Sequence, residues 1–485
     1  MTADGRVFAP PHPPPSTPLL QAAESVAARL REGGHVAYFA GGFARDTLLR
    51  RPIHDIDIAT DARPDAVQRL FAKSRAIGKS FGVIQVEYND HVFEVATFRR
   101  DLGYQDGRHP SEVEFTREEE DAQRRDFTVN GMFYDPTGPV IRDYVGGSAD
   151  MEHRCLRAIG DPEARFSEDH LRIMRAIRFA SVLEFTIEPD TWEAVRRHAV
   201  TLRAISMERI RDEWVRTLME APQPGAALRR FHASGILAVI LPEIEAMIGV
   251  EQPPEFHPEG DVFVHTCLML DQMVERTPTL IWSILLHDVA KPRTFAIGTD
   301  KEGRPRIQFR GHAELGAEMA ATIMKRFRCS NEEIDAVVGA VLRHMRFSAV
   351  PEMRNATLRR WVGGPSFPLE LELHRIDCLA SHGSLDHYHQ VLAFQEKLAQ
   401  EPVLPTAWLS GRDLIAEGIA PGPAMGRMLK WLYDAQLEGK FQDRDSALAW
   451  LRAHRDELAG MSEETAGSTD VDKPSVAPRV NHDQG

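Results

Sequence analysis

The spacing of apolar residues changes about a third of the way along the chain, and this change limits the possible folds more than any other feature. Residues 19–155 alternate short helical and strand patterns, whereas from Ser167 helical spacing dominates almost to Arg455. The fold class expected is therefore α+β, with a small mixed-sheet head followed by an all-helical neck or body and further helical parts.

Local signals set the order of elements in the head. Gly33-Gly34 end the first helical stretch, and Asn89-Asp90 turn the chain between two alternating stretches that predict a β-hairpin. The expected helices are 19–31 and 43–51, and the expected strands are 35–40, 54–60, 84–88 and 92–98.

Composition indicates the domain limits. Residues 9–18 are rich in proline, and the chain after about Leu458 is poor in large apolar residues and rich in acidic ones. We expect a disordered lead at 1–18, the head at 19–155, a helical neck at 156–255, a helical domain at 256–385, a helical tail at 386–457 and a disordered acidic tail at 458–485.

Charge and cysteine usage exclude several classes of protein. A net charge of −14 argues mildly against a general nucleic-acid coat protein. The longest nearly uncharged apolar stretches run about nine residues, too short to cross a membrane, and no signal-peptide pattern is visible. The four cysteines form no CxxC pair, so neither a zinc knuckle nor a disulfide framework is predicted, and the cytoplasm is the expected location.

A glycine turn and two aspartates suggest phosphate chemistry in the head. Gly41-Gly42 follow the strand 35–40, and Arg45 opens the next helix. Asp55 and Asp57, two apart on the following expected strand, should point to the same face and could share divalent metals. The glycines would let backbone N–H groups approach a triphosphate, and Arg45 could neutralise its oxygens. The alternative is a glycine turn with a solvated aspartate pair.

Three motifs in order add to this interpretation. GGFARDTLLRRPIHDIDIAT (41–60) closely resembles the nucleotidyltransferase signature of the class II CCA-adding enzymes and bacterial poly(A) polymerases, within the DNA polymerase beta-like superfamily. RRDFTVNG (124–131) resembles the ribose-recognition motif of this family, and EDHLRIMRAIRF (168–179) resembles its base-recognition motif. The resemblance extends to about Pro242. It implies a nucleotidyltransferase head with Asp55 and Asp57 as catalytic Mg²⁺ ligands, and an RNA-binding neck.

The third motif could read a base without a template. Asp169, Arg172, Arg175 and Arg178 recur every third residue on a helix expected from about Ser167 to Val182. Cytosine and adenine both present an amino donor beside a ring-nitrogen acceptor, which a carboxylate and a guanidinium would match. We expect Asp169 and Arg172 to read the base, and Arg175 and Arg178 to brace it or contact phosphates. A solvated arginine face is the alternative.

The second motif and the loop before it have expected roles as well. Arg125, with Asp126 and Asn130 nearby, would hold the ribose. Residues 99–115 have the composition of a mobile loop, and a surface linker is one interpretation of them. They also resemble the flexible loop with which CCA-adding members switch from C to A, which implies competence for A addition.

The second half carries a series of histidines and aspartates. A His-Asp dyad after a buried apolar run is unusual, because neither side chain belongs in a core unless it is ligated or paired. The ordered set H…HD…H…H…D resembles the HD phosphohydrolase superfamily in its two-metal version, which places an HD domain at 256–385 with Asp288 as the candidate bridge. The implied metal ligands are His265, His287, Asp288, His312, His344 and Asp377.

This donor set suits Mn, Fe, Ni or Zn, and we expect Mn, Ni or Fe. Each histidine alone could be an ordinary core or surface residue, and the HD fold could be retained only to bind RNA.

The function expected is template-independent addition of CCA to tRNA 3′ ends from CTP and ATP, with a second phosphohydrolase activity. tRNA, CTP and ATP are the expected partners, with neither membrane nor DNA. The alternatives are a poly(A) polymerase, an A-adding partner of a split system, and an HD phosphohydrolase whose head only binds RNA.

Overall fold

The computed structural model describes residues 5–78, 81–104, 110–255, 257–300, 302–398 and 404–454. The chain divides into two compact units, Met1–His344 with Glu372–Ser384 and Met345–Leu371 with Leu385–Gly485. The division differs from the expected boundary at 385, because residues 345–371 pack with the C-terminal helices. In the described part of the chain, no helix is long and apolar enough to cross a membrane.

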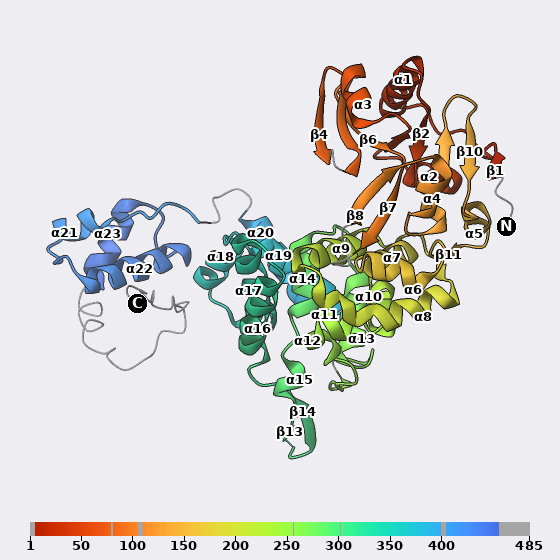
Figure 1. Cartoon of the computed structure of the whole chain (residues 1–485). Helices are drawn as coiled ribbons and strands as arrows, with labels where there is room; N and C mark the ends of the chain where they lie inside the picture. The colour runs from red at the N-terminus through yellow and green to blue at the C-terminus, as the bar shows by residue number, and fades with distance from the viewer. Residues whose placement is uncertain are drawn as a thin grey trace, which may run out of the picture. The chain divides into compact units, whose positions relative to one another are not determined.

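The head is built on one mixed sheet with the strand order β1-β10-β9-β2-β3-β6-β5-β4 (Figure 1). Neighbouring strands are antiparallel except β3 and β6, which run parallel. The strands are β1 (Arg6–Phe8), β2 (Ala37–Ala40), β3 (Ile58–Thr60), β4 (Ser74–Gly78), β5 (Val83–Tyr88), β6 (His91–Thr97), β9 (Phe133–Asp135) and β10 (Val140–Asp143).

Helix α1 (Pro18–Glu32) shows how sequence signals position the head. Thr17 caps it by accepting a hydrogen bond from the backbone N–H of Leu20, and proline occupies the first helical position. Its buried residues recur at helical spacing, so one face packs on the sheet. The other head helices are α2 (Gly42–Leu49), α3 (Pro64–Leu70), α4 (Glu118–Gln123) and α5 (Gly147–Glu152).

The α+β fold class is confirmed, and three local predictions in the head are wrong. Arg6–Phe8 lies in the expected disordered lead but pairs with β10, because a short edge strand needs only one partner edge. The strand expected at 54–60 begins only at Ile58. The expected loop at 99–115 contains the antiparallel pair β7 (Arg99–Tyr104) and β8 (Pro110–Phe115), which an ion pair between Arg100 and Glu114 joins. Residues 105–109 of that loop lie outside the described residues.

The neck and the following domain are mainly helical, as expected. The helix predicted from Ser167 is interrupted at Asp169–Leu171, so it forms two helices. The neck comprises α6 (Pro162–Glu168), α7 (Arg172–Val182), α8 (Pro189–His198), α9 (Met207–Glu220), α10 (Pro224–Ala233), α11 (Ile236–Ile240) and α12 (Pro242–Glu245), with the strand pair β11 (Cys155–Leu156) and β12 (Thr186–Ile187).

The helical domain carries one element that the sequence did not predict, the hairpin of β13 (Ala296–Thr299) and β14 (Pro305–Gln308). Its helices are α13 (Val262–Asp271), α14 (Pro278–Leu286), α15 (Lys291–Thr294), α16 (His312–Arg326), α17 (Asn331–Arg343) and α19 (Phe367–Ala380).

The second unit contains the expected helical tail. Leu432 and Leu451 lie in its buried core. Its further helices are α18 (Asn355–Val362), α20 (Asp386–Lys397), α21 (Gly411–Ala416), α22 (Pro423–Leu437) and α23 (Arg444–Ala453). The acidic tail predicted at 458–485 lies outside the described residues.

Candidate functional site

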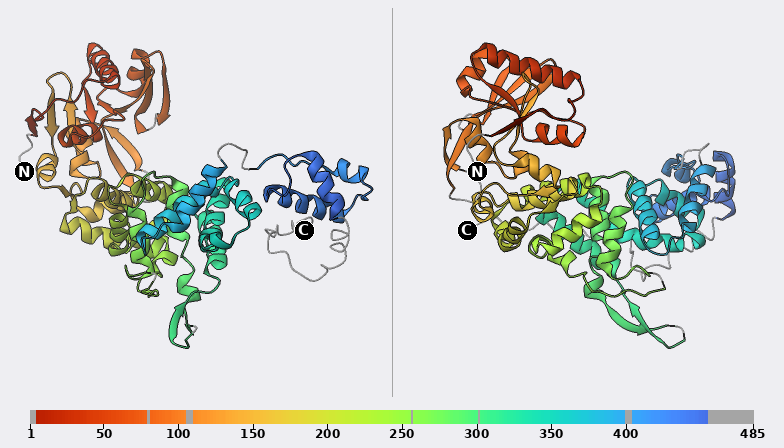
Figure 2. Two further views of the ribbon diagram at one scale, coloured as in Figure 1. Left: turned by 180° about the vertical axis from the view of Figure 1, so that it is seen from behind. Right: turned by 90° about the vertical axis from the view of Figure 1, so that its right-hand side faces the viewer.

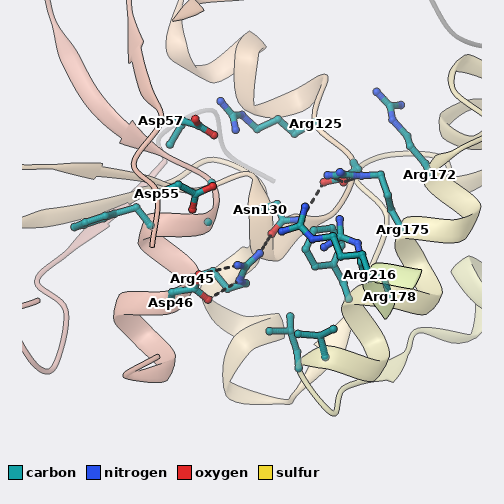
Figure 3. A pocket seen from close by; sticks show the side chains of 18 of the residues that line it. Arg45, Asp46, Asp55, Asp57, Arg125, Asn130, Arg172, Arg175, Arg178 and Arg216 are labelled. Atoms are coloured by element: carbon teal, nitrogen blue, oxygen red, sulfur yellow. Dashed lines mark hydrogen bonds and ion pairs between the residues drawn. The ribbon is translucent and has the colours of Figure 1, made fainter. Parts of the chain in front are cut away.

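A cavity of about 940 Å³ lies where β2 and α2 of the head meet α7 and α9 of the neck. Ten arginines and seven carboxylates are among its lining residues. Figure 3 shows Asp55 and Asp57 on one side of this cavity and the arginines of α7 on the other. The cavity therefore brings together the three sequence motifs, two from the head and one from the neck.

The glycine turn forms the edge of the cavity next to β2. Gly41 has a φ of +51°, and a Cβ atom there would lie 3.1 Å from the carbonyl oxygen of Asn130. Glycine is required because this backbone conformation is unfavourable for other residues and the approach leaves little room. Gly42 follows as the first residue of α2, so the start of this helix opens onto the cavity.

The two aspartates precede β3 instead of lying within it. Ile56 and Ile58 are buried while Asp55 and Asp57 are exposed, so the extended alternation continues ahead of the strand. The backbone N–H of Ala40 donates to the carbonyl oxygen of Asp57 over 2.9 Å and holds this segment against β2. Both carboxylates consequently face the cavity (Figure 3).

A third carboxylate, which the sequence analysis missed, lies beside this pair. β3 and β6 run parallel with Ile58 opposite Val95, which places Glu94 next to Asp57. Desolvation by the surrounding protein, together with the charges of Asp55 and Glu94, raises the pKa of Asp57 to about 6, against the opposing effect of Arg125. A carboxylate whose pKa is raised by neighbouring carboxylates suits a divalent cation, which would relieve their repulsion.

A hydrogen-bonded chain links the glycine turn to the neck. Arg45 donates to both carboxylate oxygens of Asp46, over 2.9 and 2.8 Å, and its Nη1 donates to Oδ1 of Asn130 over 2.7 Å. Asn130 donates to Asp126, which also accepts from Nε of Arg175 over 2.8 Å. Burial alone would raise the pKa of Asp126, but Arg175 and Asn130 outweigh it and hold this pKa at about 2.

Arg125 is positioned by a buried residue that sequence reasoning also missed. Asp121, which is 1% exposed, accepts from Nη2 of Arg125 over 3.0 Å and from Nε of Arg124 over 2.8 Å. Burial opposes ionisation of Asp121, but the two guanidinium groups lower its pKa. The signal was an aspartate on a helix, three and four residues before two arginines that follow the end of that helix. Arg125 is thereby directed toward Asp57 (Figure 3).

Asp169 and Arg172 both line the cavity but make different local contacts. Oδ1 of Asp169 accepts from the backbone N–H of Leu171, in the break between α6 and α7. Nη1 of Arg172 donates to Glu168 over 2.6 Å and to a backbone carbonyl, and Nη2 donates to a second carbonyl. These bonds use three of its five N–H groups, so two remain for a ligand.

The two further arginines of α7 brace the neck. Arg178 has a side chain that is 4% exposed, and its Nε donates to Glu213 over 2.7 Å. Arg175 is bound to Asp126, as described above. Two arginines of α9, Arg209 and Arg216, also line the cavity, and Nη2 of Arg209 lies 3.7 Å from Oδ1 of Asp169. The sequence analysis did not select these two residues, although its resemblance covered their segment.

The six residues expected as HD ligands come together in a second cluster within the first unit. Two groups of three have ligand atoms within 4.8 Å of one another. Asp288 is central, because Oδ2 lies 3.0 Å from Nε2 of His287 and Oδ1 lies 3.5 Å from Nε2 of His312. The two groups are His265, His287 and Asp377, and Asp288, His312 and His344.

The tautomers of three histidines fit a metal centre. Nδ1 of His287, His312 and His344 lies 2.8, 2.8 and 2.6 Å from a backbone carbonyl oxygen, to which it donates. Each Nε2 then presents a lone pair, and those of His312 and His344 are 3.1 Å apart. Two facing lone pairs repel unless a cation lies between them. This donor set therefore fits a divalent metal with imidazole and carboxylate ligands.

Two residues that the sequence analysis did not select support this cluster. Oε1 of Glu259 lies 2.6 Å from Nδ1 of His265, whose Nε2 lies 3.1 Å from Oδ1 of Asp377. Glu259 can therefore hold His265 with Nε2 directed toward the cluster, as outer carboxylates do in metal sites. Nζ of Lys291, three residues after Asp288 in the chain, lies 2.6 Å from Oδ2 of Asp288.

Comparison with known families identifies the parts of the chain. The family described as "Poly A polymerase head domain" matches residues 37–157, and "Probable RNA and SrmB- binding site of polymerase A" matches 184–248. The HD domain family matches residues 264–381. The fold and the site thus define a nucleotidyltransferase of the poly(A) polymerase type joined to an HD domain, and both domains imply the use of divalent metals.

Full-length relatives narrow this class. The chain is 31% identical over 428 residues to the CCA-adding enzyme of Levilactobacillus brevis, covering 88% of this chain and 96% of the relative. The CCA-adding enzyme of Lactobacillus delbrueckii subsp. bulgaricus is 30% identical over 440 residues, covering 89% and 97%. The crystal structure of the Bacillus stearothermophilus CCA-adding enzyme in complex with CTP matches with a TM-score of 0.69 and 25% identity, covering 92% and 100%. The chain belongs to the CCA-adding enzyme family.

Proposed function

We propose that the chain adds CCA to the 3′ ends of tRNA from CTP and ATP without a nucleic-acid template. The observation that carries this proposal is one cavity in which the pair Asp55 and Asp57 faces Asp169 and the arginines of α7. The similarity to CCA-adding enzymes over nearly the whole chain supports it, as does the likeness to one solved with CTP.

The residues of the cavity divide the work of nucleotidyl transfer. Asp55 and Asp57 would hold Mg²⁺, because carboxylate oxygens are the ligands this ion prefers. Such ions, when bound, neutralise the triphosphate and favour ionisation of the primer hydroxyl. The start of α2 and Arg125 face the same space and would bind the phosphates and the ribose. Arg45, with Asn130, fixes the glycine turn relative to α7.

Base selection is assigned to Asp169 and Arg172. The carboxylate would accept from the exocyclic amino group of cytosine or adenine, and the two remaining N–H groups of Arg172 would donate to the ring nitrogen. Guanine and uracil present a carbonyl beside an N–H and would leave both protein groups unsatisfied. Each such group costs roughly 1–3 kcal/mol when buried, so discrimination of about 2–6 kcal/mol is available.

Replacing Asp169 by Ala tests this assignment. Incorporation of GTP and UTP relative to CTP and ATP should rise by roughly thirtyfold or more, since about 2 kcal/mol corresponds to that factor. The measurement is kcat/KM for each of the four nucleotides on tRNA that ends in a free 3′-OH. Unchanged rejection of GTP and UTP would show that Asp169 does not read the base.

A poly(A) polymerase, or an A-adding enzyme of a split system, would share the same cavity. Purified protein incubated with tRNA lacking CCA and labelled CTP or ATP separates these functions. We expect both nucleotides to enter and extension to stop after CCA. A long A-tail on arbitrary RNA would support a poly(A) polymerase, and A addition without C addition would support the split system.

The HD cluster supports a second, hydrolytic function. We assign it removal of a 3′-phosphate, or opening of a 2′,3′-cyclic phosphate, on damaged tRNA. In the first reaction water adds to phosphorus, the P–O3′ bond breaks and the 3′ oxygen takes the proton, so inorganic phosphate and a free 3′-OH result. Mn, Ni or Fe held by the histidines and Asp288 would activate that water and polarise the phosphate.

The 3′-OH that this reaction exposes is the nucleophile that the head requires, which is a chemical reason for joining the two domains. Retention of the HD fold for RNA binding alone is the alternative. A cytoplasmic location remains part of this proposal, based on the spacing of the four cysteines.

A further inference from the structure

The hairpin β13–β14 projects from the helical domain between α15 and α16 (Figures 1 and 2). It therefore lies on the segment that joins two candidate metal ligands, Asp288 and His312. An isolated two-stranded hairpin is marginally stable in water, so one that is retained at this place requires an explanation.

The base of the hairpin is connected to the HD cluster by direct contacts. The backbone oxygen of Phe309, one residue after β14, accepts from Nδ1 of His312 over 2.8 Å. Nζ of Lys291 lies 5.2 Å from the centre of the Phe309 ring and 2.6 Å from Oδ2 of Asp288. These contacts place the base of the hairpin next to the candidate metal ligands Asp288 and His312.

The charge of the hairpin segment is opposite to that of the chain. The chain carries a net charge of −14, yet residues 291–310 hold six basic residues against two acidic ones. Arg293, Arg304 and Arg310 are exposed, and Arg304 also forms ion pairs with Asp300 and Glu302 of the hairpin turn. A cationic segment in an acidic protein, next to a candidate phosphoester hydrolase centre, is complementary to an anionic polymer.

The two faces of the hairpin differ. Ile297 pairs with Ile307 and Gly298 with Arg306, so apolar and basic residues alternate between the faces. On the apolar face Phe295 is 42% exposed and Ile297 is 71% exposed. The exposed Phe295 ring lies two residues after the exposed Arg293, and an aromatic ring with an arginine nearby in the chain suits single-stranded nucleic acid, with bases stacked on the ring and phosphates contacting the guanidinium groups.

We propose that the hairpin β13–β14 binds the single-stranded RNA next to the 3′ end whose phosphate enters the HD cluster. A strand of four residues is about 13 Å long. This length is greater than a mononucleotide held at the metals would require, and it matches several nucleotides of an RNA chain. This inference rests on the proposed hydrolytic function and names its substrate as an RNA end, in preference to a free nucleotide.

The test compares two substrates in the full-length protein loaded with Mn or Ni. One is a short single-stranded RNA with a 3′-phosphate, and the other is p-nitrophenyl phosphate. The variants are Arg293→Gln/Arg304→Gln and, separately, Phe295→Ala. The matched control is Lys73→Gln/Arg75→Gln, which removes two charges at and beside β4, in the head.

We expect the double variant to raise KM for the RNA at least tenfold and leave p-nitrophenyl phosphate hydrolysis within twofold of wild type. When the logarithm of the RNA-binding constant is plotted against the logarithm of the salt concentration, the slope should become shallower by about 0.7 for each RNA phosphate that the variant no longer neutralises. Phe295→Ala should raise KM without changing that slope. The control should match wild type on both substrates.

Equal effects on both substrates, or none, would overturn the hairpin assignment while leaving the hydrolytic function intact. If wild type hydrolyses neither substrate, the hydrolytic function is wrong. RNA binding by the hairpin is then tested separately, by measuring the Kd for the RNA in a filter-binding assay. In that case an unchanged Kd for the RNA in the double variant overturns the inference, and a tenfold weaker Kd supports it.

Discussion

Asp55→Asn and Asp57→Asn should each lower nucleotide addition to tRNA by roughly a thousandfold or more. Each substitution halves the charge of the aspartate pair and removes an ionised ligand, while the side chain keeps nearly the same size. tRNA affinity should stay within about threefold, because it depends on Lys and Arg contacts to phosphates. The measurements are single-turnover addition of CTP and ATP, and filter binding of tRNA.

Asp90→Asn is the matched control for this loss. It removes a carboxylate from an exposed turn of the same domain, at a φ of +60° that asparagine adopts readily. Addition at the wild-type rate is expected. Full activity of either Asp55→Asn or Asp57→Asn would remove the basis of the site assignment in the head.

Asp288→Ala should separate the two activities. Asp288 lies within 4 Å of His287, His312, His344 and Lys291, so its removal takes away the carboxylate that lies beside ligands of both groups. The HD metals should be lost, and tRNA ending in a 3′-phosphate should no longer be extended. tRNA ending in a free 3′-OH should be extended normally, since no candidate ligand is shared with the head.

Paired extension of the two tRNAs by wild type and variant, with Mn, Ni or Mg supplied, measures this effect, and atomic emission gives the metal content. Asp335→Ala, an exposed carboxylate on α17, is the control and should retain both the metal and the activity. If wild type cannot process the phosphorylated end with any of these metals, the repair role is wrong. Loss of extension on both tRNAs would instead show that the domains depend on each other.

The site residues that could be predicted are those whose spacing carries a motif. Asp55 and Asp57 follow a glycine turn, and the His-Asp dyad follows a buried apolar run. Glu94 and Glu259 could not be found in this way. Glu94 reaches Asp57 only because β3 and β6 pair in parallel across 37 residues of chain, from Asp57 to Glu94, and Glu259 reaches His265 by a turn outside the helix.

Composition and charge pattern also gave wrong secondary-structure predictions for some segments. Pro-rich composition hid β1, because this strand depends on pairing with the distant strand β10. Mixed charges hid β7 and β8, which pair with each other. The helix expected from Ser167 breaks at Asp169, where the side chain bonds the backbone N–H of Leu171 in competition with a continuous helix.

The sequence by itself determined the α+β class, the order of the parts and the chemical type of both sites, because these depend on periodicity and on the kinds of side chain present. Only the tertiary structure decided which donors are still available for ligands. Arg175 and Arg178 are engaged by Asp126 and Glu213, whereas two N–H groups of Arg172 remain. Hydrogen-bond partners come from segments far apart in the chain, so the local pattern that identifies an arginine cannot show what it binds.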